Sequence, residues 1–343
     1  MRRIKIKLNK PVFFFLVLTL AHLLFPQEDD AIYKVSVKKY LMGTTVETTA
    51  RCNDINYCNQ VLVNAYTEMK RIENLLSCEI DSSEVSEINI NAGIKPVKVS
   101  FETFSIIKRC RDYSKKYNGV FDMTIGPLTD LWGFSSDREV VLPDKNEIKK
   151  LVRLINYKNV EVNINDTTVY LSQKGMAIDL GGIAKGYAVD MASSVLKNSG
   201  ISNFIIKAGG DIYVSGTRDQ DSLWKIGIQD PRETNNIIAR FNLKDYAVST
   251  SGDYERYKII GGTRYHHIID VKTGYPGRLS ESSTILAPTS EEADVTSTYI
   301  FLLGWKKVFN DPSINFPILM VDQNGKIHYN KIFTEKYNLE LLK

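Results

Sequence analysis

The stretch AIDLGGIAKGYAVDM, from Ala177 to Met191, joins a short apolar strand to two glycines, a lysine and the start of an amphipathic helix. Glycines let the backbone approach a ligand without an intervening Cβ, and the first turn of a helix offers unpaired N–H groups and a positive dipole end. Lys185 adds a positive charge. The sequence matches neither the GxxxxGKS/T motif nor the GxGxxG motif, so neither of the two best-known phosphate-binding loops is present. By itself the stretch predicts either a phosphate-binding turn or a strand–helix corner without a ligand.

Downstream of this stretch the chain is rich in short segments with strand character. The predicted strands cover residues 203–207, 212–216, 224–229, 237–243, 247–250, 265–269 and 284–287. Three turns between them place glycine beside a carboxylate or a histidine: AGGDI (208–212), TSGDYERY (250–257) and HHIIDVKTG (266–274). A helix is predicted from Ser290 to Gly304, and a hairpin around Asn324-Gly325 closes the chain.

Upstream, a strand is predicted from Tyr33 to Ala50, with the glycine of Met42-Gly43-Thr44 indicating a bulge or a close backbone approach. Helices are predicted at 61–76, at 100–117 and from Asp144, and a hairpin at 160–171, whereas residues 77–91 and 118–134 show no regular period. No repeat and no linker divides the chain. We therefore predict one α+β domain over residues 31–343, in which mixed, largely antiparallel sheets pack against helices.

The first 27 residues are typical of a leader. Five of the basic residues lie among the first ten, and the formal net charge of the whole chain is only +4. The apolar run from Val12 to Phe25 is short for a membrane span but suits the core of a signal peptide. We expect residues 1–27 to be a signal peptide or an N-terminal membrane anchor, and the protein to be exported to the periplasm or the outer face of the inner membrane. Without the leader the chain is near neutral and has no basic stripe, so a nucleic-acid partner is not indicated.

All four cysteines, Cys52, Cys58, Cys78 and Cys110, lie in the first third of the chain. Export permits disulfides, and four cysteines allow three pairings that the sequence cannot separate. Their spacing fits no zinc site. We expect two structural bridges or buried thiols.

Two pairs of side chains suggest a chemical function: Asp294 with Thr298, and His266 with His267. Asp294 and Thr298 stand four residues apart on a predicted helix, hence on one face, where a carboxylate and a hydroxyl provide the hard oxygen ligands that suit Mg²⁺; such a pair is also commonplace in helices without a metal. His266 and His267 are adjacent, so on a strand only one can enter a site, as a general base or simply as a packed side chain. Serine hydrolase chemistry is not indicated, because no GxSxG elbow occurs.

Seven segments in this order resemble one family. They are MGT at 42–44, GVFDMTIGPLTDLW at 119–132, DLGGIAKGYAVD, AGGDI, TSGDYERY, HIID-x-x-TG and AD-x-x-ST. From about Leu41 to Gly304 the chain is similar to the ApbE family of exported FAD:protein FMN transferases. The resemblance implies an ApbE-like, T-fold-like domain that binds FAD and Mg²⁺ and transfers FMN to a Thr or Ser hydroxyl of an acceptor protein, with release of AMP.

The resemblance also implies roles for eleven residues. Asp294 and Thr298, together with the carbonyl of Gly182, match the metal ligands, and His267 matches the general base. The positions that match FAD contacts are Met42, Val120, Phe121, Asp122, Asp179, Lys185 and Ile268.

Two positions depart from the usual pattern of the family. Val271 replaces the proline that commonly follows HIID, which should affect only the rigidity of that turn. Glu79 stands where the family commonly carries a tyrosine that stacks on the flavin. Two other functions therefore stay open: Mg²⁺-dependent hydrolysis of FAD to FMN and AMP, in which water replaces the acceptor, and flavin binding without catalysis.

Overall fold

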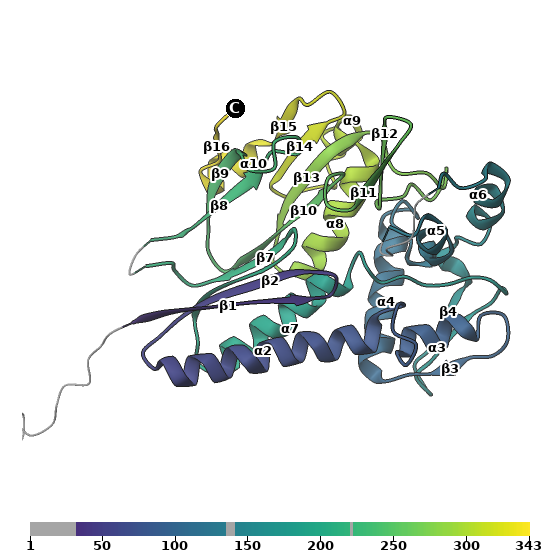
Figure 1. The fold of residues 1–343 in the computed structure, drawn as a ribbon, viewed down its shortest axis with the longest axis horizontal. Coiled ribbons are helices and arrows are strands. Elements are labelled where there is room, and N and C mark those ends of the chain that lie inside the picture. The colour runs from purple at the N-terminus through teal and green to yellow at the C-terminus, as the bar shows by residue number, and fades with distance from the viewer. Residues whose placement is uncertain (1–31, 135–140, 220–221) are drawn as a thin grey trace, which may run out of the picture.

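A computed structural model describes residues 32–134, 141–219 and 222–343. The predicted leader, residues 1–27, lies outside this part of the chain. The centre of the molecule is an eight-stranded sheet in which every neighbouring pair is antiparallel (Figure 1). Its strands, in spatial order, are β1 (Tyr33–Leu41), β2 (Thr44–Cys52), β6 (Asn203–Ala208), β7 (Asp211–Ser215), β10 (Tyr246–Gly252), β13 (Ser280–Ala287), β14 (Ile318–Asp322) and β15 (Ile327–Tyr329).

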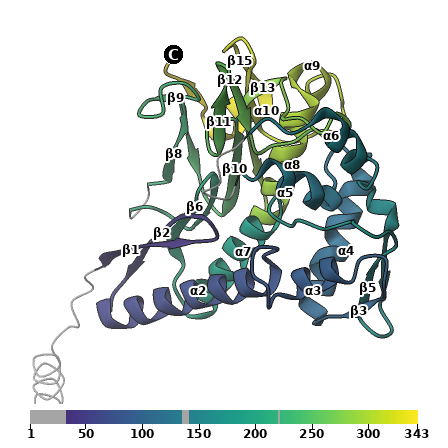
Figure 2. The ribbon, with the colours of Figure 1, turned by 45° about the vertical axis from the view of Figure 1, so that its right-hand side comes forward.

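The two faces of this sheet bury different neighbours, because successive side chains of a strand point to opposite sides. On β6, Phe204 and Ile206 join the larger core, whereas Ile205 between them joins the smaller one. The larger core is covered by three helices that lie side by side (Figures 1 and 2): α2 (Ile55–Leu76), α7 (Ala184–Asn198) and α8 (Ser290–Leu303). The smaller core is covered by β8 (Trp224–Gln229), β9 (Ile237–Leu243) and α10 (Lys331–Tyr337). The exposed β16 (Glu340–Leu341) pairs with the outer edge of β9.

The remaining elements form a side lobe and a ribbon. The lobe, on the right in Figure 2, contains α3 (Glu84–Ile90), β3 (Val97–Lys98), α4 (Phe101–Lys116), η1 (Met123–Ile125), α5 (Gly126–Trp132), α6 (Lys145–Val152), η2 (Tyr157–Asn159), β4 (Val160–Asn163) and β5 (Thr168–Leu171). The ribbon is the two-stranded pair β11 (Tyr257–Ile260) and β12 (Thr263–His266), and a short helix, α9 (Trp305–Val308), follows α8. Trp132 of α5 stacks on Tyr265 of β12, which fixes the ribbon to the lobe.

Side-chain caps explain where several helices begin. Asp54, Ser100, Asp144 and Thr289 each accept a hydrogen bond from a backbone N–H in the first turn of the helix that follows. Each cap satisfies a donor that a helix start leaves unpaired, and its loss typically costs about 1 kcal/mol. The predicted helix start at Asp144 is thus confirmed.

The predicted α+β class is confirmed, but some elements differ from the sequence-based expectation. Residues 33–50 are not one strand: Met42 and Gly43, with φ of 53° and 67°, form a two-residue hairpin turn between β1 and β2, so the predicted bulge is wrong. The unpatterned segments hold short helices, α3 in 77–91 and η1 with α5 in 118–134, which are too short to show a helical period.

One disulfide joins Cys52 to Cys58, at the end of β2 and the start of α2. Cys78 and Cys110 are free thiols, the first exposed and the second buried. The first alternative, two bridges, is therefore wrong, and the second, a buried thiol, holds for Cys110. In the described ranges, no helix is both long enough and apolar enough to cross a membrane.

Candidate functional site

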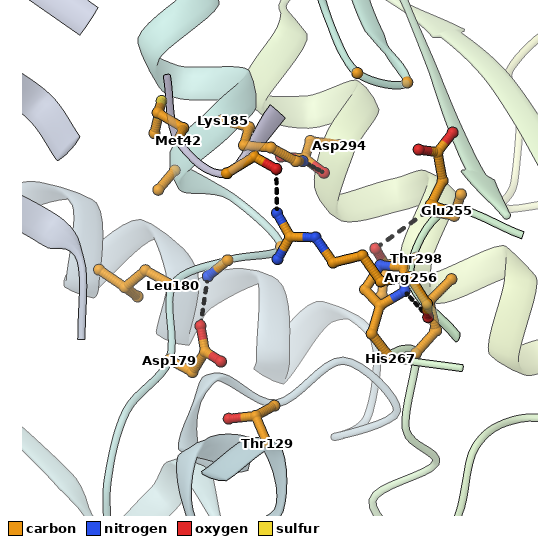
Figure 3. Close-up of a pocket in the computed structure, with 18 of the residues that line it drawn as sticks. Met42, Thr129, Asp179, Leu180, Lys185, Glu255, Arg256, His267, Asp294 and Thr298 are labelled. Carbon is orange, nitrogen blue, oxygen red and sulfur yellow. Dashed lines mark hydrogen bonds and ion pairs between the residues drawn. The ribbon is translucent and has the colours of Figure 1, made fainter. Parts of the chain in front are cut away.

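A cavity of about 730 Å³ opens where the large sheet, the starts of α7 and α8, the side lobe and the root of the ribbon meet. All eleven residues assigned from the sequence line this one cavity, although they come from positions between 42 and 298. Figure 3 shows Lys185 and Asp294 on one side, and His267 with Arg256 on another. The sequence assignment and the geometry therefore agree on the location of the site.

Lys185, in the first turn of α7, is held between two buried carboxylates. Its Nζ lies 2.8 Å from Oδ2 of Asp211 and 3.3 Å from both carboxylate oxygens of Asp294. Burial disfavours the charge of Lys185, but the two carboxylates outweigh it and raise the lysine pKa. Burial, and then the charge of Asp211, raise the pKa of Asp294. Two carboxylates share one cation, so the cluster carries an excess of negative charge.

The three residues predicted to hold a metal, Asp294, Thr298 and Gly182, all line the cavity. Asp294 and Thr298 lie on successive turns of α8, as predicted, and Thr298 Oγ1 is 3.3 Å from Oγ of Ser251. Gly182 lies close to both Phe121 and Thr298: a Cβ added to it would be 3.0 Å from Phe121 Cε2 and 3.9 Å from Thr298 Oγ1. The described residues contain no cluster of three or more His, Cys, Asp or Glu side chains that could hold a metal. A carboxylate, a hydroxyl and a backbone carbonyl in a cluster with excess negative charge do fit Mg²⁺, which usually takes few protein ligands.

His267 directly follows β12 and is the only one of the two adjacent histidines that lines the cavity. Its backbone N–H donates to the Arg256 carbonyl at 3.0 Å, and its Nδ1 lies 3.3 Å from the same oxygen. A carbonyl can only accept, so we assign the ring proton to Nδ1, which leaves the lone pair on Nε2. Burial, with the charge of Arg256 second, lowers the pKa of His267 to about 3 and keeps the ring neutral. A neutral ring with a free lone pair can accept a proton.

His266 points away from the cavity. It is buried against Phe301, donates from Nε2 to the carbonyl of Gly277 at 2.7 Å, and accepts at Nδ1 from the N–H of Ile268 at 3.3 Å. The expectation that only one of the two histidines enters the site is confirmed.

The remaining assigned residues also line the cavity. Met42 sits in the β1–β2 turn, and its N–H donates to Glu73 at 2.8 Å. Asp179 accepts from the N–H of Gly181 at 2.7 Å, which shapes the glycine turn before α7. Asp122 accepts from the N–H and hydroxyl of Thr124 and from the N–H of Tyr157, so its buried carboxylate organises the η1 turn. Phe121, Val120 and Ile268 add apolar surface.

Three of the charged residues that line this cavity but were missed by the sequence assignment are Asp211, Glu255 and Arg256. All three lie in motifs that were recognised, AGGDI and TSGDYERY, and charge beside a glycine turn was the available signal. The guanidinium of Arg256 crosses the cavity and donates from Nη2 to the carbonyl of Gly43 at 3.1 Å (Figure 3).

A family model described as the ApbE family matches residues 42–311, and this chain belongs to that family. Two similar proteins are each named FAD:protein FMN transferase. The one from Treponema pallidum is 33% identical over 261 residues, 72% of either chain. The one from Klebsiella pneumoniae is 32% identical over 281 residues, 81% of this chain and 85% of the relative.

Solved structures show the same fold. The ApbE protein of Thermotoga maritima superposes with a TM-score of 0.83 at 35% identity, covering 88% of this chain and 99% of that one. The flavin transferase ApbE of Vibrio cholerae gives a TM-score of 0.78 at 26% identity, with 89% and 99% covered. These comparisons confirm the predicted resemblance, the fold and the expectation of an enzyme of the transferase class.

Proposed function

We propose that this protein transfers FMN from FAD to a Thr or Ser hydroxyl of an acceptor protein and releases AMP, with Mg²⁺ as cofactor. Membership of a family whose named relatives are flavin transferases supports the reaction. The observation that carries the proposal is the position of His267: a neutral imidazole with a free Nε2 shares one cavity with a buried cluster of oxygen ligands. A proton acceptor and a site for pyrophosphate charge are what this transfer needs.

In the proposed reaction the acceptor oxygen bonds to the flavin-side phosphorus of FAD. The bond from that phosphorus to the bridging oxygen breaks, and AMP leaves with this oxygen. His267 Nε2 takes the hydroxyl proton, while the Arg256 carbonyl holds the ring through Nδ1. A positioned base typically contributes 10²- to 10⁴-fold.

The other assigned residues hold the substrate. We assign the side chains of Asp294 and Thr298 and the carbonyl of Gly182 as the groups that would hold Mg²⁺. Bound there, Mg²⁺ would neutralise charge on the pyrophosphate oxygens. Met42, the 120–122 turn, Asp179, Lys185 and Ile268 are assigned to FAD contacts because they line the same cavity.

The test is to incubate the purified protein with FAD, Mg²⁺ and the exported proteins of its source organism. We expect mass spectrometry to find one added FMN on a Thr or Ser residue and an equal amount of AMP. AMP and FMN without a modified protein would instead support FAD hydrolysis, and FAD bound but intact would support a non-catalytic flavin-binding protein. The His267→Ala variant should bind FAD but not modify an acceptor.

We further propose that the protein works outside the cytoplasm, at the periplasmic face of the membrane. The Cys52–Cys58 disulfide supports this location, because disulfides persist mainly in oxidising compartments. Cell fractionation with sequencing of the mature N-terminus tests it and shows whether residues 1–27 are removed or kept as an anchor. A reduced protein recovered in the cytosol would contradict the proposal.

A further inference from the structure

The charge of Lys185 is taken up by neighbouring carboxylates, which leaves little of it for a phosphate. Lys185 contacts Asp211 and Asp294 together, so its charge is already more than balanced. The carboxylates that line the cavity are Glu73, Glu79, Asp122, Asp179, Asp211, Glu255 and Asp294. A pyrophosphate would bring further negative charge into this surface, and unscreened like charges repel strongly in a partly buried site.

Arg256 is the other cationic side chain among the residues that line the cavity. Within the described ranges it forms no ion pair with a carboxylate; its guanidinium donates from Nη2 to the backbone carbonyl of Gly43. The side chain crosses the open cavity to reach this oxygen (Figure 3). A guanidinium that crosses a cavity to a neutral carbonyl keeps its charge available for an anion.

The backbone of Arg256 places this charge beside the proposed base. Its carbonyl accepts from the N–H of His267 and faces Nδ1 of the same residue. The loop before it is clamped, because Asp253 binds Arg232 through two hydrogen bonds of 2.7 and 2.9 Å and Arg264 through one of 3.1 Å. His267 and the start of the Arg256 side chain are therefore fixed relative to each other, while the guanidinium end is held by one hydrogen bond.

We propose that Arg256 binds the flavin-side phosphate of FAD, exchanging the carbonyl of Gly43 for phosphate oxygens when the nucleotide enters. This inference rests on the proposed function, in which the phosphorus under attack is the flavin-side one and must lie near His267. A guanidinium can form two parallel hydrogen bonds to phosphate oxygens, which suits it to orient that group as well as to neutralise it.

The exchange also affects the base. After burial, the positive charge of Arg256 contributes most to the low pKa of His267. A phosphate bound to Arg256 offsets this charge, so proton uptake by His267 becomes easier once the substrate is in place. The same residue thus makes the base more effective when FAD is bound than when the cavity is empty.

Flavin titrations of the full protein test the inference. Affinities for FAD, FMN, riboflavin and AMP are measured for the wild type, Arg256→Met, Arg256→Lys and the control Lys258→Met, a cation of the ribbon outside the residues that line the cavity. Arg256→Met should lower the affinity for FMN and for FAD by about tenfold to a hundredfold, the usual effect of losing a charged hydrogen bond. The affinities of Arg256→Met for riboflavin and AMP should change less than about twofold. The affinities of Arg256→Lys for FMN and FAD should lie between those of the wild type and Arg256→Met, and Lys258→Met should bind all four ligands like the wild type.

Equal losses for riboflavin and FMN in Arg256→Met would overturn the inference, since they would indicate a change of cavity shape. A loss confined to AMP, or no loss at all, would also overturn it, while FAD binding by the wild type would leave the proposed function standing. A wild type that binds no FAD would overturn both. Thermal melting of each variant shows that the comparison is made on folded protein.

Discussion

The two sides of the cavity that carry charge are built differently. The core wall consists of Lys185, Asp211 and Asp294, on α7, β7 and α8, and its carboxylates are only 2% and 4% exposed. The ribbon wall consists of Arg256 and His267, at the root of the β11–β12 ribbon, whose Ile259 is 64% exposed. Dense packing resists displacement, whereas a two-stranded ribbon alone is only marginally stable.

The two walls therefore suit different roles, one in binding and the other in the reaction. The core wall is held by the main core and suits the binding of a metal and a pyrophosphate at a fixed place. The ribbon wall depends on a few contacts, the hydrogen bonds to Asp253 and the stacking of Tyr265 on Trp132. It carries the groups that we propose to meet the attacked phosphate and the acceptor. We expect substitutions in the core wall to impair metal binding and stability, and those in the ribbon wall to impair the reaction.

The largest effect is expected from Asp294→Asn, which keeps the shape of the side chain but removes its charge. Removal even of a group that only supports a metal ligand typically costs 10- to 100-fold in metal affinity, so loss of the carboxylate should raise the Mg²⁺ concentration for half-maximal activity by at least about 100-fold. Magnesium titration of the transfer rate measures this. Glu292→Gln, on the same helix with its long 3.8 Å contact to Lys116, is the control. An unchanged Mg²⁺ response would remove the proposed metal site.

Gly186→Ala tests whether α7 and α8, which carry Lys185 and Asp294 of the core wall, are packed too tightly to admit one more methyl group. A Cβ at this position would lie 2.3 Å from the carbonyl oxygen of Ser290 and 2.9 Å from Cβ of Asp294, where α7 crosses α8. Because backbone atoms cannot rotate away, we expect a loss of about 3 kcal/mol in the free energy of unfolding, measured by urea denaturation. Ser194→Ala, which adds no volume to the same helix, should cost less than about 1 kcal/mol. Equal losses in the two variants would show that the crossing can adapt.

His266, the last residue of β12 and the neighbour of His267, should make the folded state sensitive to acid. Burial, despite the hydrogen bond to Gly277, lowers its pKa to about 4 from an ordinary value of 6.5. Between these values the unfolded chain binds the proton and the folded chain does not, so this contribution to stability is lost as pH falls from 6.5 to 4. The unfolding free energy of the wild type relative to His266→Gln should therefore drop by about 2 kcal/mol from pH 7 to pH 4.5. A difference that is the same at both pH values would contradict the assignment.

The smallest effect is expected at Glu79, which lines the cavity at the position where the family commonly has a tyrosine. An aromatic pair contributes about 0.5–1.5 kcal/mol beyond its burial, so Glu79→Tyr should tighten FAD binding by about two- to tenfold in a fluorescence titration. Glu79→Gln separates removal of the charge from addition of the ring. If Tyr and Gln act alike, the ring does not stack on the flavin.

The sequence predicted much of this molecule because its signals are local. The apolar period of α2 follows from which side chains face the core. The seven family segments supplied all eleven assigned residues, and these line one cavity. Two kinds of feature were not predictable. The single turn of η1 and the seven residues of α5 are too short to show a period. The partners of Lys185 and Arg256 lie 26 and 213 residues away, and such pairings depend on how the chain folds.

The most direct test of this division of work measures FAD affinity in the presence of Mg²⁺ and single-turnover transfer in the same two variants, His267→Gln and Asp294→Asn. We expect His267→Gln to bind FAD within about twofold of the wild type and to lose 10²- to 10⁴-fold in the rate of transfer. We expect Asp294→Asn to lose Mg²⁺-dependent FAD affinity. Two variants that lose affinity and rate to the same extent would contradict the separation of a core wall that binds from a ribbon wall that reacts.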